Sequence, residues 1–171
     1  MTTLLLRLAA PLQSWGVGAK FDRRGTERIP TKSGVIGLVA AALGRRRSES
    51  VEDLCALRFG VRVDRDGALL RDFHTAKKKD EKDPYVTNRY YLSDAVFLAG
   101  LEGDHELLSV IEPALRFPVF PLFLGRRSCP PEGQVSLGIR NRTLLEALRE
   151  EPWLVSDWAK KREMPEVHLL T

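Results

Sequence analysis

The chain is poor in the residues that bind metals and form disulfides. Its 171 residues include only two cysteines and three histidines. Cys55 and Cys129 are far apart and have no second pair beside them, so we expect no disulfide framework and a reducing, cytoplasmic location. His74, His105 and His168 lie beyond helical reach of one another and of both cysteines. No zinc spacing exists, and we expect neither a metal site nor a cofactor.

Long apolar runs are also missing. The longest, residues 35–43, is far shorter than the roughly 20 residues that a membrane-spanning helix requires. Only three consecutive leucines precede the first charge, at Arg7, so we expect no secretory signal. Hydrophobic residues make up 43% and charged residues 29%, which is typical of a single globular domain with a buried core. This composition argues against a disordered tail, a coiled coil and a membrane protein.

Positive charge is concentrated at the start of the chain. Residues 1–47 hold nine Lys or Arg and two acidic residues, whereas the remainder holds 18 basic and 21 acidic residues. A cationic segment of this kind indicates an anionic partner. The alternative is a solvated basic surface that only aids solubility, and charge alone does not separate the two interpretations.

Hydrophobic periodicity predicts a mixture of strands and helices. Alternating apolar residues predict strands, and apolar residues at i, i+3, i+4 and i+7 predict amphipathic helices. Pro113 is expected to break or offset the second main helix, and Pro121 to place the last strand at a sheet edge. The predicted order is a strand (4–8), a helix (35–43), two strands (59–63 and 69–75), a charged hairpin tip (77–84), a long central strand (90–101), a helix (107–115), a strand (119–124) and a final helix opened by a capping box (143–146).

The core of this order is strand, helix, strand, strand, helix, strand. It predicts an α+β, ferredoxin-like fold of the βαββαβ type, which RRM-type RNA-binding proteins share. A basic loop, residues 13–30, joins the first strand to the first helix. Loops of that length in compact domains are commonly functional.

The start of the first helix is a candidate phosphate site. Thr31, Lys32 and Ser33 resemble the end of a phosphate-binding loop, but threonines stand where that loop needs glycines. Free backbone N–H groups and an ammonium at a helix start still suit one phosphate. The simpler interpretation is an ordinary N-cap with a lysine that faces solvent.

Two further features suggest contact with a nucleic acid. Arg126 and Arg127 follow Gly125 in a turn that could reach a phosphate or a base edge, although a stiff polar turn anchored by prolines explains them equally. Trp15 is the single tryptophan of the basic loop and could stack on a base. Its alternative role, which we favour slightly, is to anchor the loop to the core.

Acid–base cleavage of RNA is a third possibility. His74, Tyr90 and Tyr91 with neighbouring lysines supply the base, the acid and the cation that metal-independent cleavage requires. The base of a hairpin also collects His and Tyr for packing, so the pattern has a structural explanation.

Five segments together resemble a known family. They occur in this order: LLRLAAPLQSWG (5–16), RIPTKSGVIGL (28–38), DFHT (72–75), RYYLSDA (89–95) and PLFLGRRSCP (121–130). In this combination they resemble the CasD family, a subunit of the type I-E CRISPR surveillance complex Cascade within the RAMP superfamily.

The resemblance implies a function in antiviral defence. It implies a ferredoxin-like RNA-binding domain (1–125) with a β-hairpin thumb at about 73–91, followed by a Gly-Arg-Arg loop and a partial C-terminal extension (126–171). Such a subunit caps the 5′ handle of the CRISPR RNA, and its partners are that RNA, the backbone subunit that the thumb contacts, and the large subunit, with no membrane. The type I-E family is non-catalytic, whereas type I-C relatives cut the repeat RNA, which leaves a metal-independent endoribonuclease as the alternative.

Residue by residue, the resemblance and the charge pattern nominate an RNA-binding set. Two departures accompany it: the thumb tip is short for the family, and the chain stops at Thr171 where relatives continue, so we expect the C-terminal region to be incomplete. The nominated residues are Gln13, Ser14, Trp15, Lys20, Arg23, Arg24, Arg28, Thr31, Lys32, Ser33, Arg89, Arg126, Arg127 and Ser128.

Overall fold

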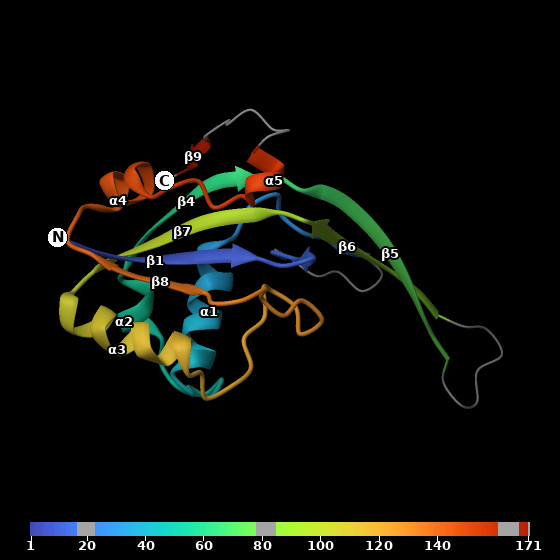
Figure 1. The fold of residues 1–171 in the computed structure, drawn as a ribbon. Helices are drawn as coiled ribbons and strands as arrows, with labels where there is room; N and C mark the ends of the chain where they lie inside the picture. Colours follow the sequence, from blue (N-terminus) through green and yellow to red (C-terminus); the bar gives the residue numbers. More distant parts are fainter. Residues whose placement is uncertain (17–22, 78–84, 161–167, 171) are drawn as a thin grey trace.

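The computed structural model describes residues 1–16, 23–77, 85–160 and 168–170, in a mixed α+β arrangement of antiparallel sheets and helices (Figure 1). It confirms the predicted fold class at this level. The strands are β1 (Thr2–Ala9), β2 (Leu12–Gln13), β3 (Arg23–Arg24), β4 (Arg58–Arg65), β5 (Ala68–Ala76), β6 (Tyr85–Ser93), β7 (Val96–Gly103), β8 (Ser136–Arg140) and β9 (His168–Leu170). The helices are α1 (Lys32–Ala42), α2 (Glu52–Cys55), α3 (His105–Arg116), α4 (Leu144–Glu150) and α5 (Asp157–Lys160).

The main sheet has the strand order β8-β1-β7-β4-β9, and its neighbouring strands are antiparallel. Helices α1 and α3 lie against one face of this sheet and α4 lies against the other (Figure 1). Three consecutive leucines in β1, Leu4 to Leu6, are explained by the burial of both faces of the strand. Leu4 and Leu6 enter the core beneath α1 and α3, whereas Leu5 enters the smaller core beneath α4 with Leu144 and Leu148. Both faces of the strand are therefore buried.

The second sheet is built on a long hairpin. Strands β5 and β6 pair from Ala68 opposite Ser93 to Ala76 opposite Tyr85, and together they extend away from the body of the molecule (Figure 1). Short strands β2 and β3 flank β6 at the base of the hairpin. The hairpin was expected, but its strands begin earlier in the chain, and most of its tip lies outside the described residues.

Two of the predicted strands need correction. The long central strand expected over 90–101 is two strands, β6 and β7, because Asp94 between them has a φ of 56° and turns the chain from one sheet to the other. Residues 119–124 form no strand. The strand beside β1 at the edge of the main sheet is instead β8, which lies beyond the predicted domain boundary at residue 125.

The helices agree better with their predictions. Thr31 caps α1 by accepting a hydrogen bond from the Gly34 N–H at 3.2 Å, and Thr143 opens α4 with the predicted capping box. Pro113 does not end α3, contrary to expectation. Pro113 and Ser109, whose carbonyl loses its helical partner, are both exposed, so water can bond that carbonyl. Within the described part of the chain, no helix has the length and apolar character needed to cross a membrane.

Candidate nucleic-acid interface

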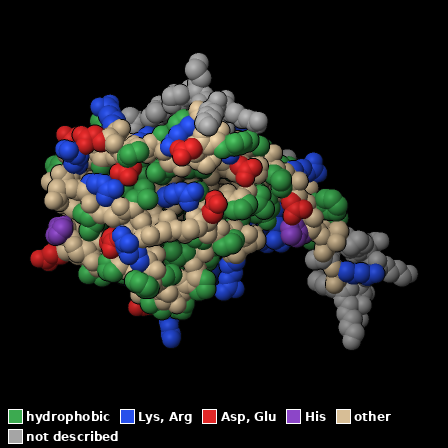
Figure 2. All heavy atoms as spheres, viewed as in Figure 1, with side chains coloured by type: hydrophobic (Ala, Val, Ile, Leu, Met, Phe, Trp, Pro, Cys, Tyr) green, Lys and Arg blue, Asp and Glu red, His purple; other side chains and the backbone are tan. Residues whose placement is uncertain are grey.

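A cavity of about 950 Å³ lies where five segments meet: the end of α1 with the residues after it, β3, β6, the stretch 120–123 and the turn 125–130. One wall is apolar, with Phe120, Leu122 and Phe123. The remaining wall is cationic, and no Asp or Glu is found among the described residues that line it. Its arginines are Arg24, Arg47, Arg89, Arg126 and Arg127. This excess of positive charge distinguishes the cavity from the face of the molecule in Figure 2, where both signs are interspersed.

Arg126 organises the cavity from within. Its guanidinium donates hydrogen bonds to the carbonyls of Tyr90 at 3.2 Å, Arg24 at 2.8 Å and Gly25 at 3.0 Å. It also lies 4.8 Å from the centre of the Tyr91 ring, a cation–π contact. Arg126 therefore ties the turn to β3 and β6. Most of its donors are occupied, so it is first a positioning residue.

The glycine before Arg126 is required by the close approach of two chain segments. Gly125 has a φ of 85°, and a Cβ at this position would lie 1.7 Å from the carbonyl oxygen of Ser14. The turn is closed by hydrogen bonds from Leu124 N–H to the Cys129 carbonyl at 2.7 Å and from Cys129 N–H to the Arg126 carbonyl at 2.8 Å. Burial raises the pKa of the Cys129 thiol, which fits a packed side chain and not a nucleophile.

The other cavity arginines have no such internal partners. Arg24, Arg47 and Arg127 are exposed, and their side chains form no hydrogen bond or ion pair with the residues that the structure describes. Arg89 is half-buried, and its Nε is fully buried with no hydrogen-bond partner. A buried guanidinium N–H without an acceptor is costly, because the donor loses its water and gains nothing in return. An anion in the cavity would supply the missing acceptor.

The residues nominated after β1 are structural, which corrects the prediction that their side chains contact RNA. Trp15 is 1% exposed and Gln13 and Ser14 are equally buried. Gln13 donates to the Ala95 carbonyl at 2.8 Å and accepts from Trp15 Nε1 at 3.1 Å. Ser14 donates to the Tyr90 carbonyl at 3.2 Å. Trp15 anchors the basic loop, as its alternative interpretation predicted, and offers no stacking surface.

The helix start does not reach the cavity either. Thr31 Oγ1 is used as the N-cap of α1, and Lys32 Nζ donates to the Cys55 carbonyl at 2.7 Å. Ser33 is exposed, with its hydroxyl 3.4 Å from that of Thr31. The cavity is lined instead by Ala41, near the opposite end of α1, and by Arg47, which follows the helix.

Four nominated residues remain, and they differ in where they lie. Arg28 is exposed outside the cavity lining, and Ser128 lines the cavity beside Arg127. The backbone of Arg23 pairs with Asn88, and its side chain lies outside the described residues. Lys20 lies wholly outside them.

The three residues nominated for RNA cleavage are not brought together. Tyr90 and Tyr91 are consecutive in β6, so their side chains point to opposite faces of the hairpin. Tyr91 lies opposite Leu70, four residues from His74 along β5, a separation of about 13 Å at the usual rise of a strand. His74 Nε2 instead lies 2.7 Å from Asp72 Oδ2. Among the described residues, no three His, Cys, Asp or Glu side chains are grouped to hold a metal.

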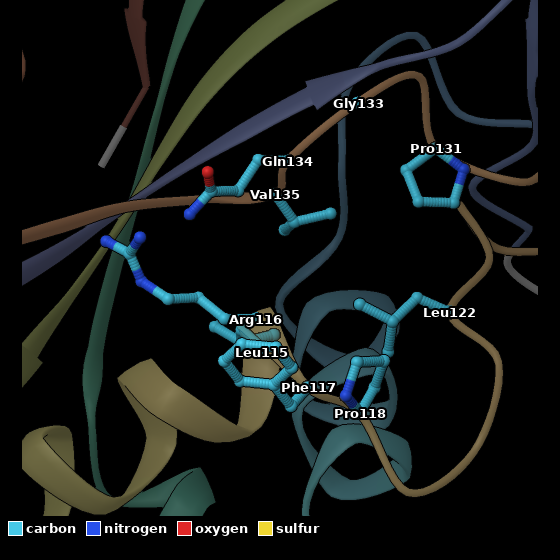
Figure 3. A pocket seen from close by; sticks show the side chains of 9 residues that line it. All are labelled: Leu115, Arg116, Phe117, Pro118, Leu122, Pro131, Gly133, Gln134 and Val135. Carbon is cyan, nitrogen blue, oxygen red and sulfur yellow. The ribbon is translucent and has the colours of Figure 1, made fainter.

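A second, smaller pocket of about 470 Å³ lies between the end of α3, the residues that follow it and residues 131–135 (Figure 3). Leu115, Phe117, Leu122 and Val135 give it an apolar lining, and Leu122 belongs to both pockets. Its arginine, Arg116, is engaged with Glu112 of the same helix. The two pockets thus differ in character, and only the larger one is cationic.

Comparisons with known proteins now identify the chain. Residues 3–168 match the family described as CRISPR-associated protein (Cas_Cas5). The chain belongs to the CRISPR-associated Cas5 family. It is 36% identical over 156 residues to the CRISPR system Cascade subunit CasD of Escherichia coli strain K12, which covers 79% of this chain and 70% of that protein. The resemblance seen in the sequence is confirmed.

The chain is also similar to two solved structures. A Cas protein crystal structure is 52% identical with a TM-score of 0.75 and covers 90% of this chain and 72% of its own. A chain of a CRISPR RNA-guided surveillance complex is 38% identical with a TM-score of 0.78, covering 87% of this chain and 68% of its own. The Cas5 match over residues 3–168 includes every residue that lines the cationic cavity.

Among the cavity residues that sequence reasoning did not nominate are one arginine, Arg47, and two aromatic residues, Phe120 and Phe123. Arg47 was counted in the basic first quarter of the chain, but nothing in the run of three arginines at 45–47 separates it from its neighbours. Phe120 and Phe123 were assigned to a strand that does not exist. A signal was present nonetheless: Pro118 and Pro121 lie beside and within the expected strand, and proline cannot donate a hydrogen bond to a neighbouring strand.

Proposed function

We propose that this chain is an RNA-binding subunit of a Cascade-type CRISPR surveillance complex and that its cationic cavity holds the 5′ handle of the CRISPR RNA. The observation that carries the proposal is the cavity itself, with five arginines and no carboxylate among the described lining residues. The similarity to E. coli CasD and to a chain of an RNA-guided surveillance complex supports the same assignment. The cytoplasm remains the predicted location.

The cavity offers a single-stranded RNA end two kinds of contact. Arg89 and Arg127 present guanidinium groups, which bind phosphate oxygens through paired, charge-assisted hydrogen bonds. Phe120 and Phe123 form the apolar wall against which an unstacked base can pack. The main sheet is unavailable for this purpose, because α4 covers the face that RRM-type proteins leave open for RNA. The RNA is therefore expected to bind in the cationic cavity and not on the main sheet.

The finer fold assignment belongs to the same proposal. The order β8-β1-β7-β4, with α1 and α3 on one face, supports a ferredoxin-like βαββαβ core. The hairpin of β5 and β6 is proposed as the thumb. On one of its faces Leu69, Phe73 and Val86 are 50%, 68% and 47% exposed, an apolar surface that suits contact with a neighbouring subunit.

The subunit is proposed to hold RNA without cutting it. The separation of His74 from Tyr91, and of Tyr90 from both, supports this choice over an endoribonuclease. The deciding experiment incubates the purified chain with labelled CRISPR repeat RNA in EDTA and follows binding by fluorescence anisotropy and cleavage on a denaturing gel.

The expected result is intact RNA, bound by the wild-type chain and bound more weakly by Arg127→Ala. The matched control is Arg149→Ala, which removes an exposed arginine from α4 on the opposite side of the sheet. Equal binding by wild type and Arg127→Ala/Arg89→Ala would refute the cavity as the RNA site. A single defined cut in EDTA would make the chain an enzyme.

A further inference from the structure

The hairpin places an acid directly opposite Arg89, the cavity arginine whose Nε is buried with no hydrogen-bond partner among the described residues. Asp72 on β5 is the register partner of Arg89 on β6. Side chains in such a pair project from the same face with Cβ atoms about 5 Å apart, and opposite charges there attract. The structure nevertheless pairs Asp72 with His74, two residues along β5 on the same face, at 2.7 Å. Arg89 Nε is left buried without an acceptor.

We propose that His74 is a positioning residue, which holds the Asp72 carboxylate away from Arg89 and so keeps Arg89 available to a phosphate of the bound RNA. The inference rests on the proposed function, since it assigns a task to residues beside the same cavity. Without His74, the carboxylate turns across the hairpin to Arg89. It then competes with the RNA phosphate for the same guanidinium.

Few other charged side chains near Arg89 are placed to pair with Asp72 or with Arg89. Arg71, the nearest other cation on β5, projects from the opposite face of the hairpin and donates to Asn88 Oδ1 at 3.0 Å. The described lining of the cavity contributes no carboxylate to Arg89. Asp72 is therefore the acid best placed to neutralise Arg89. If Asp72 pairs with His74, the positive charge of Arg89 stays available in the cavity, and if Asp72 pairs with Arg89, that charge is neutralised.

The contact between His74 and Asp72 is of the kind that a positioning role requires. The His74 and Asp72 side chains are 43% and 45% exposed, so the pair contributes little to folding. The distance of 2.7 Å between His74 Nε2 and Asp72 Oδ2 is that of a close ion pair. A His74 variant that retains a hydrogen-bond donor of similar reach should keep the carboxylate in place, whereas one without a donor should release it.

The test measures the affinity of the purified chain for a labelled single-stranded CRISPR repeat RNA in a set of variants. His74→Ala is expected to weaken binding roughly two- to fivefold, the size of one cross-strand charge pair. His74→Gln, which keeps a side-chain N–H donor, should bind as the wild type does. Asp72→Asn in the His74→Ala background should restore wild-type affinity, because the competing charge is gone.

Arg89→Ala provides the decisive background. In that variant, which binds RNA more weakly than the wild type, His74→Ala should have no further effect. An equal loss from His74→Ala in the presence and absence of Arg89, or a failure of Asp72→Asn to restore binding, would overturn the positioning role. Failure of the proposed function looks different, since the wild type and Arg89→Ala would then bind RNA equally.

Discussion

Two regions of this molecule treat arginine in opposite ways. Behind the main sheet, Arg62 is buried against Asp64, with Nε and Nη2 donating to its carboxylate at 2.6 and 2.9 Å. The same guanidinium donates to the carbonyls of Leu148, Glu151 and Pro152, at the end of α4 and just beyond it. In front, the cavity arginines Arg47 and Arg127 have no partner among the described residues, and the Nε of Arg89 is buried without one.

The difference separates arginines that hold the fold from arginines that await a ligand. Arg62 satisfies its N–H donors inside the protein and replaces the capping groups that the end of α4 lacks. A buried charge is tolerated when it has a counter-ion and its hydrogen-bond donors are satisfied. The cavity concentrates like charges instead, a destabilising arrangement for an empty surface and a favourable one for an anion. Arg126 stands between the two classes, because it lines the cavity while its donors serve the backbone.

The largest effect is expected where the paired region is broken. Asp64→Ala leaves the Arg62 guanidinium buried without its counter-ion and also removes the acceptor for the Leu154 N–H. Removal of one partner from a buried ion pair costs about 3–5 kcal/mol. At about 2–4 °C per kcal/mol, we expect the melting temperature to fall by about 10 °C or more. Calorimetry measures it, and an unchanged melting temperature would show that the buried pair does not hold α4 to the sheet.

The next effect is expected in binding without a change in stability. The double variant Arg89→Ala/Arg127→Ala removes two unpartnered cations from the cavity, and we expect about 30-fold weaker RNA binding at moderate salt, with the slope of log affinity against log salt reduced by about 2. Its melting temperature should be unchanged or slightly higher, since like charges are removed. Anisotropy titrations at several salt concentrations give the slope. A slope equal to that of the wild type would mean that neither arginine contacts a phosphate.

Arg126→Ala should fall between the two regions. It removes three hydrogen bonds to main-chain carbonyls and the contact with Tyr91, for which we expect a loss of about 1–3 kcal/mol in the free energy of unfolding. RNA binding should weaken as well, because the turn that carries Arg127 is no longer tied to β6. Denaturation and anisotropy on the same preparation check both effects. A loss of binding with unchanged stability would make Arg126 a direct RNA contact.

The sequence predicted the helices of the fold better than it predicted the cavity. Local signals suffice for α1 and α4, because Thr31 and Thr143 satisfy the first N–H groups of each helix within four residues. Strand β8 was not predicted because few of its residues are apolar. In β8, Gly138 has a φ of 92° and weakens the strand pattern, whereas the apolar residues 119–124 resemble a strand and serve as pocket walls.

The site was predictable only in part, for a related reason. The Gly-Arg-Arg turn and Arg89 were nominated from the sequence and line the cavity, yet sequence alone cannot divide arginines into paired and unpaired ones. That division depends on contacts between segments far apart in the chain, such as Arg126 with the carbonyl of Arg24. Trp15 shows the same limit, since its burial follows from a hydrogen bond to Gln13 and from packing in the core. The basic loop lies beside the cavity, but among its described residues only Arg24 lines it.

The smallest effect separates two neighbours within one run of charge. Arg45 pairs with Asp53 through two hydrogen bonds, at 2.6 and 2.5 Å, whereas Arg47, two residues on, lines the cavity. Arg45→Ala should therefore lower stability without changing RNA binding, and Arg47→Ala should weaken RNA binding without changing stability. Because the Arg45–Asp53 pair is solvent-exposed, its contribution is less than about 1 kcal/mol after screening.

The pH dependence of that small loss tests its origin. The hydrogen bond from Arg45 lowers the pKa of Asp53 from 3.8 to about 2. A carboxyl whose pKa is lower in the folded state stabilises the fold at pH values above its unfolded pKa, and this contribution disappears as the pH falls from about 4 through about 2. Chemical denaturation of wild type and Arg45→Ala should thus differ at pH 7 and converge near pH 2. A difference that persists at pH 2 would assign the effect to packing of the Arg45 side chain, and the contrast with Arg47 would then rest on shape and not on charge.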